Sequence, residues 1–225
     1  MNQSAGNEPA GPAGGPPGAA RPKMAVADAE NRYRPLSPFW RGLLMTATVI
    51  TVLLSIYMLF NLGHTFGYVP VDTQYFFILL ALLLPLCLLV FPLRKTGKVG
   101  SRGTERALFG FDLLLMAAAI GANVYLFTYA RDIVNLGWEW AAPTHIQIAS
   151  GILWLLVLEA TRRAAGLSVF LIVLVFSTYP LYGEWLPDPL ETFENEPFGK
   201  TVAFHSISSE SILCIAFLAF ANLVI

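Results

Sequence analysis

Long apolar runs alternate with short polar segments along this chain, and the first three runs are the clearest. Residues 42–60 and 75–93 contain no charged residue, and residues 107–130 contain one, Asp112. A helix rises about 1.5 Å per residue, so each run is long enough for the hydrocarbon core of a bilayer, which is about 30 Å thick. The third run also has small residues four apart, which favours close helix packing. These small pairs are Ala117/Gly121 and Ala118/Ala122.

Three later apolar runs complete the pattern. Residues 145–160 are short and include Gln147, Ser150 and Glu159, which suits a tilted or partly shielded span. Residues 164–183 form a fifth apolar run, followed by an aromatic belt that ends at Trp185. Residues 211–225 begin a sixth run that stops before it is long enough to span. The sequence therefore predicts an all-α, polytopic transmembrane helix bundle of about six membrane segments, the last one truncated.

The first 38 residues differ from the rest of the chain. They are rich in Gly, Pro and Ala and bury too little apolar surface to offset the entropy of ordering, so we expect a disordered cytoplasmic tail over residues 1–38. The tail lacks the apolar core of a signal peptide. We therefore expect the first membrane helix to act as an uncleaved signal anchor.

The basic residues predict the orientation, because Lys and Arg in short loops are retained in the cytoplasm. With the N-terminus and the 94–106 loop inside, 12 of the 14 basic residues are cytoplasmic, and only Arg131 and Lys200 are outside. Residues 61–74, 131–143 and 184–204 then lie outside. The fourth span is needed for this result, since without it Arg162 and Arg163 would be outside. The twelve are Arg21, Lys23, Arg32, Arg34, Arg41, Arg94, Lys95, Lys98, Arg102, Arg106, Arg162 and Arg163.

The composition argues against a soluble enzyme. Hydrophobic residues make up 56% and charged residues 13% of the chain, with a mean hydropathy of +0.60, whereas a soluble domain has about 25% charged residues. The net charge of -1 provides no basic face for nucleic acid. The sequence has no phosphate-binding loop, nucleophile elbow or suitably spaced carboxylate pair. We therefore expect no enzyme activity and assign no catalytic, cofactor-binding or metal-binding residue; the substrate-binding residues stay unknown.

The cysteines and histidines are too scattered to predict a metal site or a disulfide framework. Cys87 and Cys214 each lie inside an apolar run, where we interpret them as small apolar fillers. His64, His145 and His205 have no cysteine or carboxylate at ligand spacing, so we expect interfacial polar roles for them.

Three polar features have both a functional and a structural interpretation. Asp112 is an intramembrane acid, a candidate for ion coupling, but it lies in the first turns of its helix, where the helix dipole and basic residues of the 94–106 loop favour a structural role. Glu159 has Arg162 and Arg163 three and four residues later, which favours a local ion pair. The residues 208–210 (SSE) are typical of a helix start, although polar residues there can also line a transport path.

Five segments of the second half of the chain have a familiar pattern: residues 158–167 (LEATRRAAGL), 170–176 (FLIVLVF), 179–183 (YPLYG), 209–213 (SESIL) and 219–225 (AFANLVI). In these segments the chain resembles the fused permeases of tripartite ATP-independent periplasmic (TRAP) transporters, of the TAXI type. The resemblance covers residues 145–225, and the earlier spans agree with it more loosely.

The resemblance implies a division of the chain. In this family a small four-helix membrane subunit precedes a large subunit that holds the substrate and sodium sites. Residues 39–160 would correspond to the small part and residues 161–225 to the incomplete start of the large transport domain. Sodium, the expected coupling ion, would then bind in the missing part, and no other cofactor is expected.

The leading functional hypothesis follows from this resemblance. The chain would be a permease component of a sodium-coupled secondary transporter for organic acids, a multi-pass protein of the bacterial inner membrane with a cytoplasmic N-terminus. Its expected partners are a periplasmic solute-binding protein, the remainder of the large permease domain and the lipid bilayer. We expect the acidic outer segment from Glu184 to Lys200 to meet the binding protein. The alternative is a structural or assembly subunit with no substrate site of its own.

Overall fold

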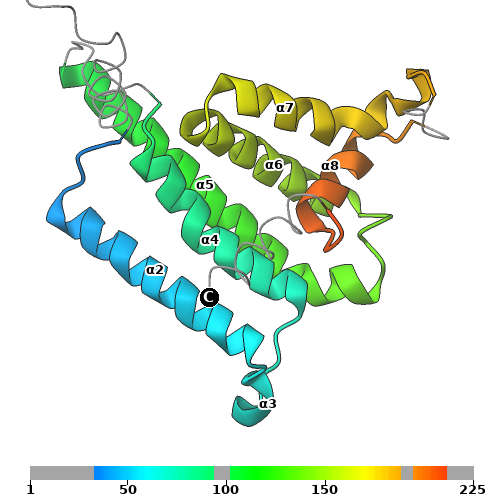
Figure 1. Ribbon diagram of the computed structural model, residues 1–225, viewed down its shortest axis with the longest axis horizontal. Helices are drawn as coiled ribbons and strands as arrows, with labels where there is room; N and C mark the ends of the chain where they lie inside the picture. Colours follow the sequence, from blue (N-terminus) through cyan, green and yellow to red (C-terminus); the bar gives the residue numbers. More distant parts are fainter. Residues whose placement is uncertain (1–32, 94–101, 189–194, 212–225) are drawn as a thin grey trace, which may run out of the picture.

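The computed structural model describes residues 33–93, 102–188 and 195–211, and these residues form helices joined by short connections (Figure 1). The sixth predicted segment, most of the predicted tail and Cys214 lie outside the described residues. The elements, in chain order, are α2 (Pro38–Leu59), α3 (Gly63–Phe66), α4 (Asp72–Val90), α5 (Arg102–Asn135), α6 (Thr144–Ala164), α7 (Leu167–Thr178), the 3-10 turns η1 (Tyr179–Leu181) and η2 (Gly183–Trp185), and α8 (Phe198–Ile207).

Among the described residues, four helices are long and apolar enough to cross a membrane: α2, α4, α5 from Gly103, and α6. They match the first four predicted segments, including the short fourth one. The fifth predicted segment is an apolar helix over Leu167–Leu181, which is shorter than these four. It begins after Gly166, whose φ of 90° interrupts the helix, and it tightens into η1. The structure thus supports an all-α membrane protein, but it does not confirm a count of about six spans.

The central helix is α4, which packs against α2, α5 and α6. Most of its side chains are buried, which fits a helix that is apolar on all sides. The contact with α5 is extensive and uses one face of α5. The buried residues of that face recur at helical spacing and are Asp112, Met116, Ala119, Ala122, Asn123, Leu126, Ala130 and Ile133. Of the small pairs, Ala118 and Ala122 lie toward the core, whereas Ala117 and Gly121 are exposed.

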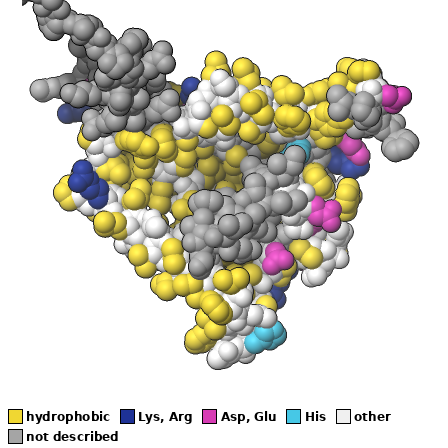
Figure 2. Space-filling model, viewed as in Figure 1, with side chains coloured by type: hydrophobic (Ala, Val, Ile, Leu, Met, Phe, Trp, Pro, Cys, Tyr) yellow, Lys and Arg dark blue, Asp and Glu magenta, His cyan; other side chains and the backbone are white. Residues whose placement is uncertain are grey.

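Helix α2 lies at the edge of the bundle and packs mainly on α4 (Figure 1). A hydrogen bond of 2.8 Å from the Tyr75 hydroxyl to Ser55 Oγ joins the two helices. Large apolar side chains of α2 are exposed, including Met45 at 70% and Leu53 at 60%. Hydrophobic side chains also cover much of the face shown in Figure 2. In a bilayer, such side chains would contact lipid.

Helix α8 is an element that the sequence pattern did not predict, since it lies partly in the segment expected as an outer loop. It packs on α6 and touches α7, burying Val202, Ala203 and Ile207. Gly199 permits the close approach, because a Cβ there would stand 2.1 Å from Gln147 Oε1.

The two ends of the bundle differ in charge. Because successive long helices run in opposite directions, the starts of α2 and α5 meet the ends of α4 and α6 (Figure 1). Among the described residues, this basic end has six basic and three acidic residues, whereas the opposite, acidic end has two basic and seven acidic residues. The basic end comprises Arg34, Arg41, Arg102, Arg106, Arg162 and Arg163 with Glu105, Asp112 and Glu159. The acidic end comprises Arg131 and Lys200 with Asp72, Asp132, Glu139, Glu184, Asp188, Glu196 and Glu210.

Candidate functional site

The basic end contains a network of ion pairs around Asp112, which is fully buried on α5. Its two carboxylate oxygens accept hydrogen bonds from arginines in different parts of the chain. Arg163, near the end of α6, donates from Nη1 to Oδ1 at 2.6 Å. Arg34, in the segment before α2, donates from Nη2 to Oδ2. One carboxylate thus connects three separate parts of the chain.

Local contacts hold both arginines in place. The backbone N–H of Arg34 donates to the carbonyl of Val90 at 3.0 Å, and its guanidinium lies over the Phe109 ring, 5.1 Å from the centroid. Arg163 Nη1 lies 3.4 Å from the carbonyl oxygens of Leu88 and Phe91, at the C-terminal end of α4. A cation is favourable there, because the last carbonyls of a helix lack helical partners and carry the negative end of its dipole.

Glu159 and Arg162 extend this network along α6. Glu159 accepts a hydrogen bond of 2.7 Å from Arg163 Nε and forms a two-point ion pair with Arg162 at 2.7 and 2.8 Å. We call the five side chains the charge cluster: Arg34, Asp112, Glu159, Arg162 and Arg163. Three arginines against two carboxylates leave the charge cluster with a net charge of +1.

Two guanidinium nitrogens of the charge cluster are buried without a hydrogen-bond partner, namely Arg34 Nη1 and Arg163 Nη2. The Arg163 side chain is 1% exposed and that of Arg34 is 18% exposed. Buried donors are normally satisfied, and each exception calls for an explanation such as a water or an ion. The charge cluster therefore combines a net positive charge with two buried donors that have no partner among the described residues.

The sequence predicted part of this network. The ion pair of Glu159 with Arg162 and Arg163 is confirmed. Asp112 also has basic partners, which among the described residues are Arg34 and Arg163; most of the 94–106 loop lies outside the described residues. No pattern in the sequence indicated that Arg34 pairs with Asp112. Arg34 contributed only to the predicted orientation of the chain in the membrane.

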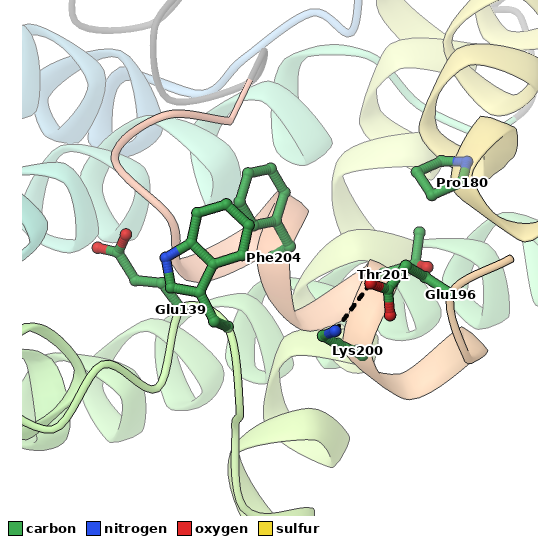
Figure 3. Close-up of a pocket in the computed structure, with 7 residues that line it drawn as sticks. Glu139, Pro180, Glu196, Lys200, Thr201 and Phe204 are labelled. Atoms are coloured by element: carbon green, nitrogen blue, oxygen red, sulfur yellow. Dashed lines mark hydrogen bonds and ion pairs between the residues drawn. The ribbon is translucent and has the colours of Figure 1, made fainter. Parts of the chain in front are cut away.

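The acidic end holds a small hollow between α8, η1 and the segment before α6 (Figure 3). Its volume is about 180 Å³, below the range of about 300–1,000 Å³ that is usual for ligand pockets. The Trp140 and Phe204 rings lie 5.3 Å apart on one side. The hollow is lined by Glu139, Trp140, Pro180, Glu196, Lys200, Thr201 and Phe204.

The charged groups beside this hollow are largely matched within the protein. Lys200 Nζ donates to Glu196 Oε1 at 2.8 Å, so the two charges offset each other. In Figure 3 the carboxylate of Glu139 is turned away from Pro180 and Thr201, and it accepts a hydrogen bond of 3.3 Å from Ser208 Oγ. The hollow is suited to a small apolar group more than to an ionic substrate.

The segment 208–210 forms a turn at the end of the described residues. Ser208 has extended φ and ψ of -78° and 135°, and its Oγ accepts a hydrogen bond of 3.1 Å from the backbone N–H of Glu210. A serine hydroxyl that accepts from the N–H two residues later stabilises a turn, and such a turn also occurs at helix starts. The residues that would form the capped helix lie outside the described residues, so the capping and transport-path interpretations both stay predictions.

The remaining polar candidates do not gather into a site. His145 packs against the rings of Tyr129 and Trp138. His205 is half-buried, and burial lowers its pKa despite a hydrogen bond to the backbone of Ser177. Cys87 packs against the core, as expected for an apolar filler. No group of three or more metal-ligating side chains is found in the part of the chain that the structure describes.

No protein-family model, curated protein or solved structure matches this chain. Function is therefore inferred from the residues and their geometry, together with the resemblance noted from the sequence.

Proposed function

We propose that this chain is a membrane permease component of a sodium-coupled secondary transporter for organic acids, and that it works with an extracytoplasmic solute-binding protein. The proposal places the basic end in the cytoplasm of a bacterium and the acidic end outside. Its support is the resemblance to TRAP permeases, the four long apolar helices and the unequal charge of the two ends.

The position of the charged side chains favours a framing role for the described helices, meaning that they support the transport domain and hold no coupling-ion site themselves. Helix α5 has 34 residues, about 51 Å at about 1.5 Å per residue, which exceeds the hydrocarbon core by about 20 Å. Asp112 is its eleventh residue and can therefore lie near a membrane boundary. It is also paired with Arg34 and Arg163, unlike a carboxylate that is free to bind a coupling ion. The substrate and sodium sites then belong to the remainder of the permease.

The position of the charges agrees equally with the alternative, a structural or assembly subunit without a substrate site of its own. The two functions differ in their partner. A permease component retains a solute-binding protein at its outer face, whereas an assembly subunit has no reason to do so.

Co-purification separates the two functions. The tagged chain would be expressed with a complementary TRAP permease domain and a TAXI-type solute-binding protein, and the amount of binding protein retained would be measured at several salt concentrations. We expect retention that weakens with salt, because complementary charge guides association and is screened within about 3 Å at 1 M. No retention at any salt concentration would contradict the permease proposal and favour the assembly subunit.

A charge variant tests whether the acidic segment from Glu184 to Lys200 makes this contact. The change is the joint replacement of Glu191, Glu194 and Glu196 by Gln; the first two lie outside the described residues. We expect weaker retention of the binding protein and a shallower salt dependence. Glu105→Gln, an exposed acid at the basic end, is the matched control and should change neither. Equal retention by both variants would show that the segment is solvated surface only.

A further inference from the structure

The charge cluster at the basic end combines an excess of positive charge with unused donors. Two guanidinium groups flank the single carboxylate of Asp112, one on each oxygen. Arg34 Nη1 and Arg163 Nη2 are left without a partner although both atoms are buried. We propose that this cluster binds the phosphate group of an anionic phospholipid. The proposal concerns the membrane lipid and does not depend on transport.

Electrostatics is the first argument for an anionic ligand. The cluster sums to +1, and the side chains of Asp112 and Arg163 are 0% and 1% exposed. The excess of positive charge is shared with Arg34 and Arg162, whose side chains are 18% and 36% exposed, so it attracts an anion from the surface of the bundle. A phosphate oxygen bearing a negative charge would offset this excess, and the Arg34 side chain would turn toward it to offer its buried Nη1.

Hydrogen-bond geometry is the second argument. A guanidinium is a planar group of five N–H donors, and it binds phosphate and carboxylate oxygens through two nitrogens at once. Here each arginine donates some of its N–H groups to protein oxygens and has one terminal nitrogen without a hydrogen-bond partner. Arg34 is the more exposed of the two at 18%, so the headgroup would approach from its side.

The place of the cluster in the bundle selects a lipid over free phosphate. The cluster lies where α4 and α6 end, beside the aromatic residues Tyr33 and Trp40. The ring of Tyr33 packs on Phe91 at 5.3 Å, and that of Trp40 on Phe109 at 6.3 Å. Tyrosine and tryptophan are enriched at the level of lipid headgroups. Phospholipid phosphates are present at that level in any bilayer. Inorganic phosphate has the same oxyanion chemistry but is not concentrated at the headgroup level.

The test uses the full chain in nanodiscs of phosphatidylcholine with increasing phosphatidylglycerol. Native mass spectrometry would count bound phosphatidylglycerol, and the thermal midpoint would report the stabilisation that binding gives. We expect a saturable preference of the wild type for phosphatidylglycerol. Arg34→Lys keeps the charge but loses the planar donor group, so its affinity should fall about tenfold, as expected for one lost charged hydrogen bond. Arg41→Lys, an exposed arginine at the same end, is the matched control and should bind like the wild type.

Three outcomes would overturn the proposal. The first is a wild type without preference for phosphatidylglycerol, a result that does not depend on how any variant folds. The second is an equal affinity of the Arg34→Lys and Arg41→Lys variants, which would indicate general surface charge. The third is an equal stabilisation by inorganic phosphate in pure phosphatidylcholine, which would assign the site to free phosphate.

Discussion

Asp112 illustrates what the sequence reveals about a single residue and what it leaves open. An acid in an apolar helix indicates a need for a basic partner, and that prediction is correct. Its partners lie 78 and 51 residues away along the chain, so local spacing does not identify them. Glu159 is the opposite case, since its partners are three and four residues away on the same helix and were identified from the sequence.

Replacing Asp112 by Asn should strongly destabilise the protein. Among the described residues, Asp112 has the only carboxylate that contacts both Arg34 and Arg163, and the loss of one partner from a buried ion pair costs about 3–5 kcal/mol. The free energy of unfolding in detergent, measured by denaturant titration, would test this. Glu159→Gln is the control and should cost less, because its side chain is 24% exposed and Arg163 keeps Asp112. If Asp112→Asn lowered the free energy of unfolding no more than Glu159→Gln does, the result would contradict the account.

Gly63→Ala is a second substitution with a clear expectation. A Cβ at Gly63 would lie 2.5 Å from the backbone oxygen of Tyr68 and 3.0 Å from the Cα of Val69, so the backbone itself must move. We expect a destabilisation of about 1–3 kcal/mol, as for overpacked sites. Gly42→Ala is the control, since a Cβ at Gly42 would have no neighbouring atom within 4 Å and the site is helical. Thermal unfolding in one detergent would compare them, and an unchanged midpoint for Gly63→Ala would refute the close contact.

At the scale of elements, hydrophobic runs predicted the four long helices and a separate fifth apolar segment but not α8, and they placed the break before the fifth segment at residues 161–163 instead of at Gly166. The length of an apolar run is visible in sequence, and it decides whether a helix can span. Helix α8 has ten residues that mix polar and apolar types, and its packing on α6 depends on the small Gly199. The interruption at Gly166 depends on one dihedral angle within an apolar context. Hydrophobic periodicity predicts neither the packing of α8 nor the position of the break at Gly166.

The packing of α8 should depend on pH through His205. Burial lowers the pKa of His205 below its ordinary value of 6.5, so the folded protein favours the neutral ring. The unfolded chain binds the proton more readily, so stability is greatest above the unfolded pKa and falls as pH is lowered toward 5. His205→Gln should reduce this loss, and His64→Gln, at an exposed position, should leave it unchanged. Thermal unfolding midpoints of the wild type and both variants, measured between pH 8 and pH 5, would test this. An equal change of the midpoint with pH in the wild type and in His205→Gln would contradict the prediction.

For the whole molecule, the charge difference between the two ends is the feature that sequence and structure share. The sequence assigned 12 of 14 basic residues to one side, and the structure brings those it describes together at one end of the bundle. The pairing within that end could not be predicted, because it depends on how three helices meet. The proposed partner at the acidic end and the proposed lipid at the basic end both depend on this arrangement.

The chain alone should not transport. The charged side chains of its described spans lie near the helix ends, and the one buried carboxylate among them, Asp112, is already paired with two arginines. Proteoliposomes with the isolated chain and an inward sodium gradient should take up no more organic acid than empty liposomes. An ionophore control would verify that the gradient persists. Sodium-dependent uptake by the isolated chain would contradict the framing role.

The orientation of the bundle in intact cells is the most direct test of the account, since both proposed binding surfaces require it. Cysteine would be introduced at Arg106 on the basic end or at Trp185, which is 80% exposed, on the acidic end, after Cys87 and Cys214 are replaced by Ala. A membrane-impermeant thiol reagent should label the cysteine at position 185 in intact cells and the cysteine at position 106 only after lysis. Labelling of position 106 in intact cells, with protection of position 185, would contradict the central claim.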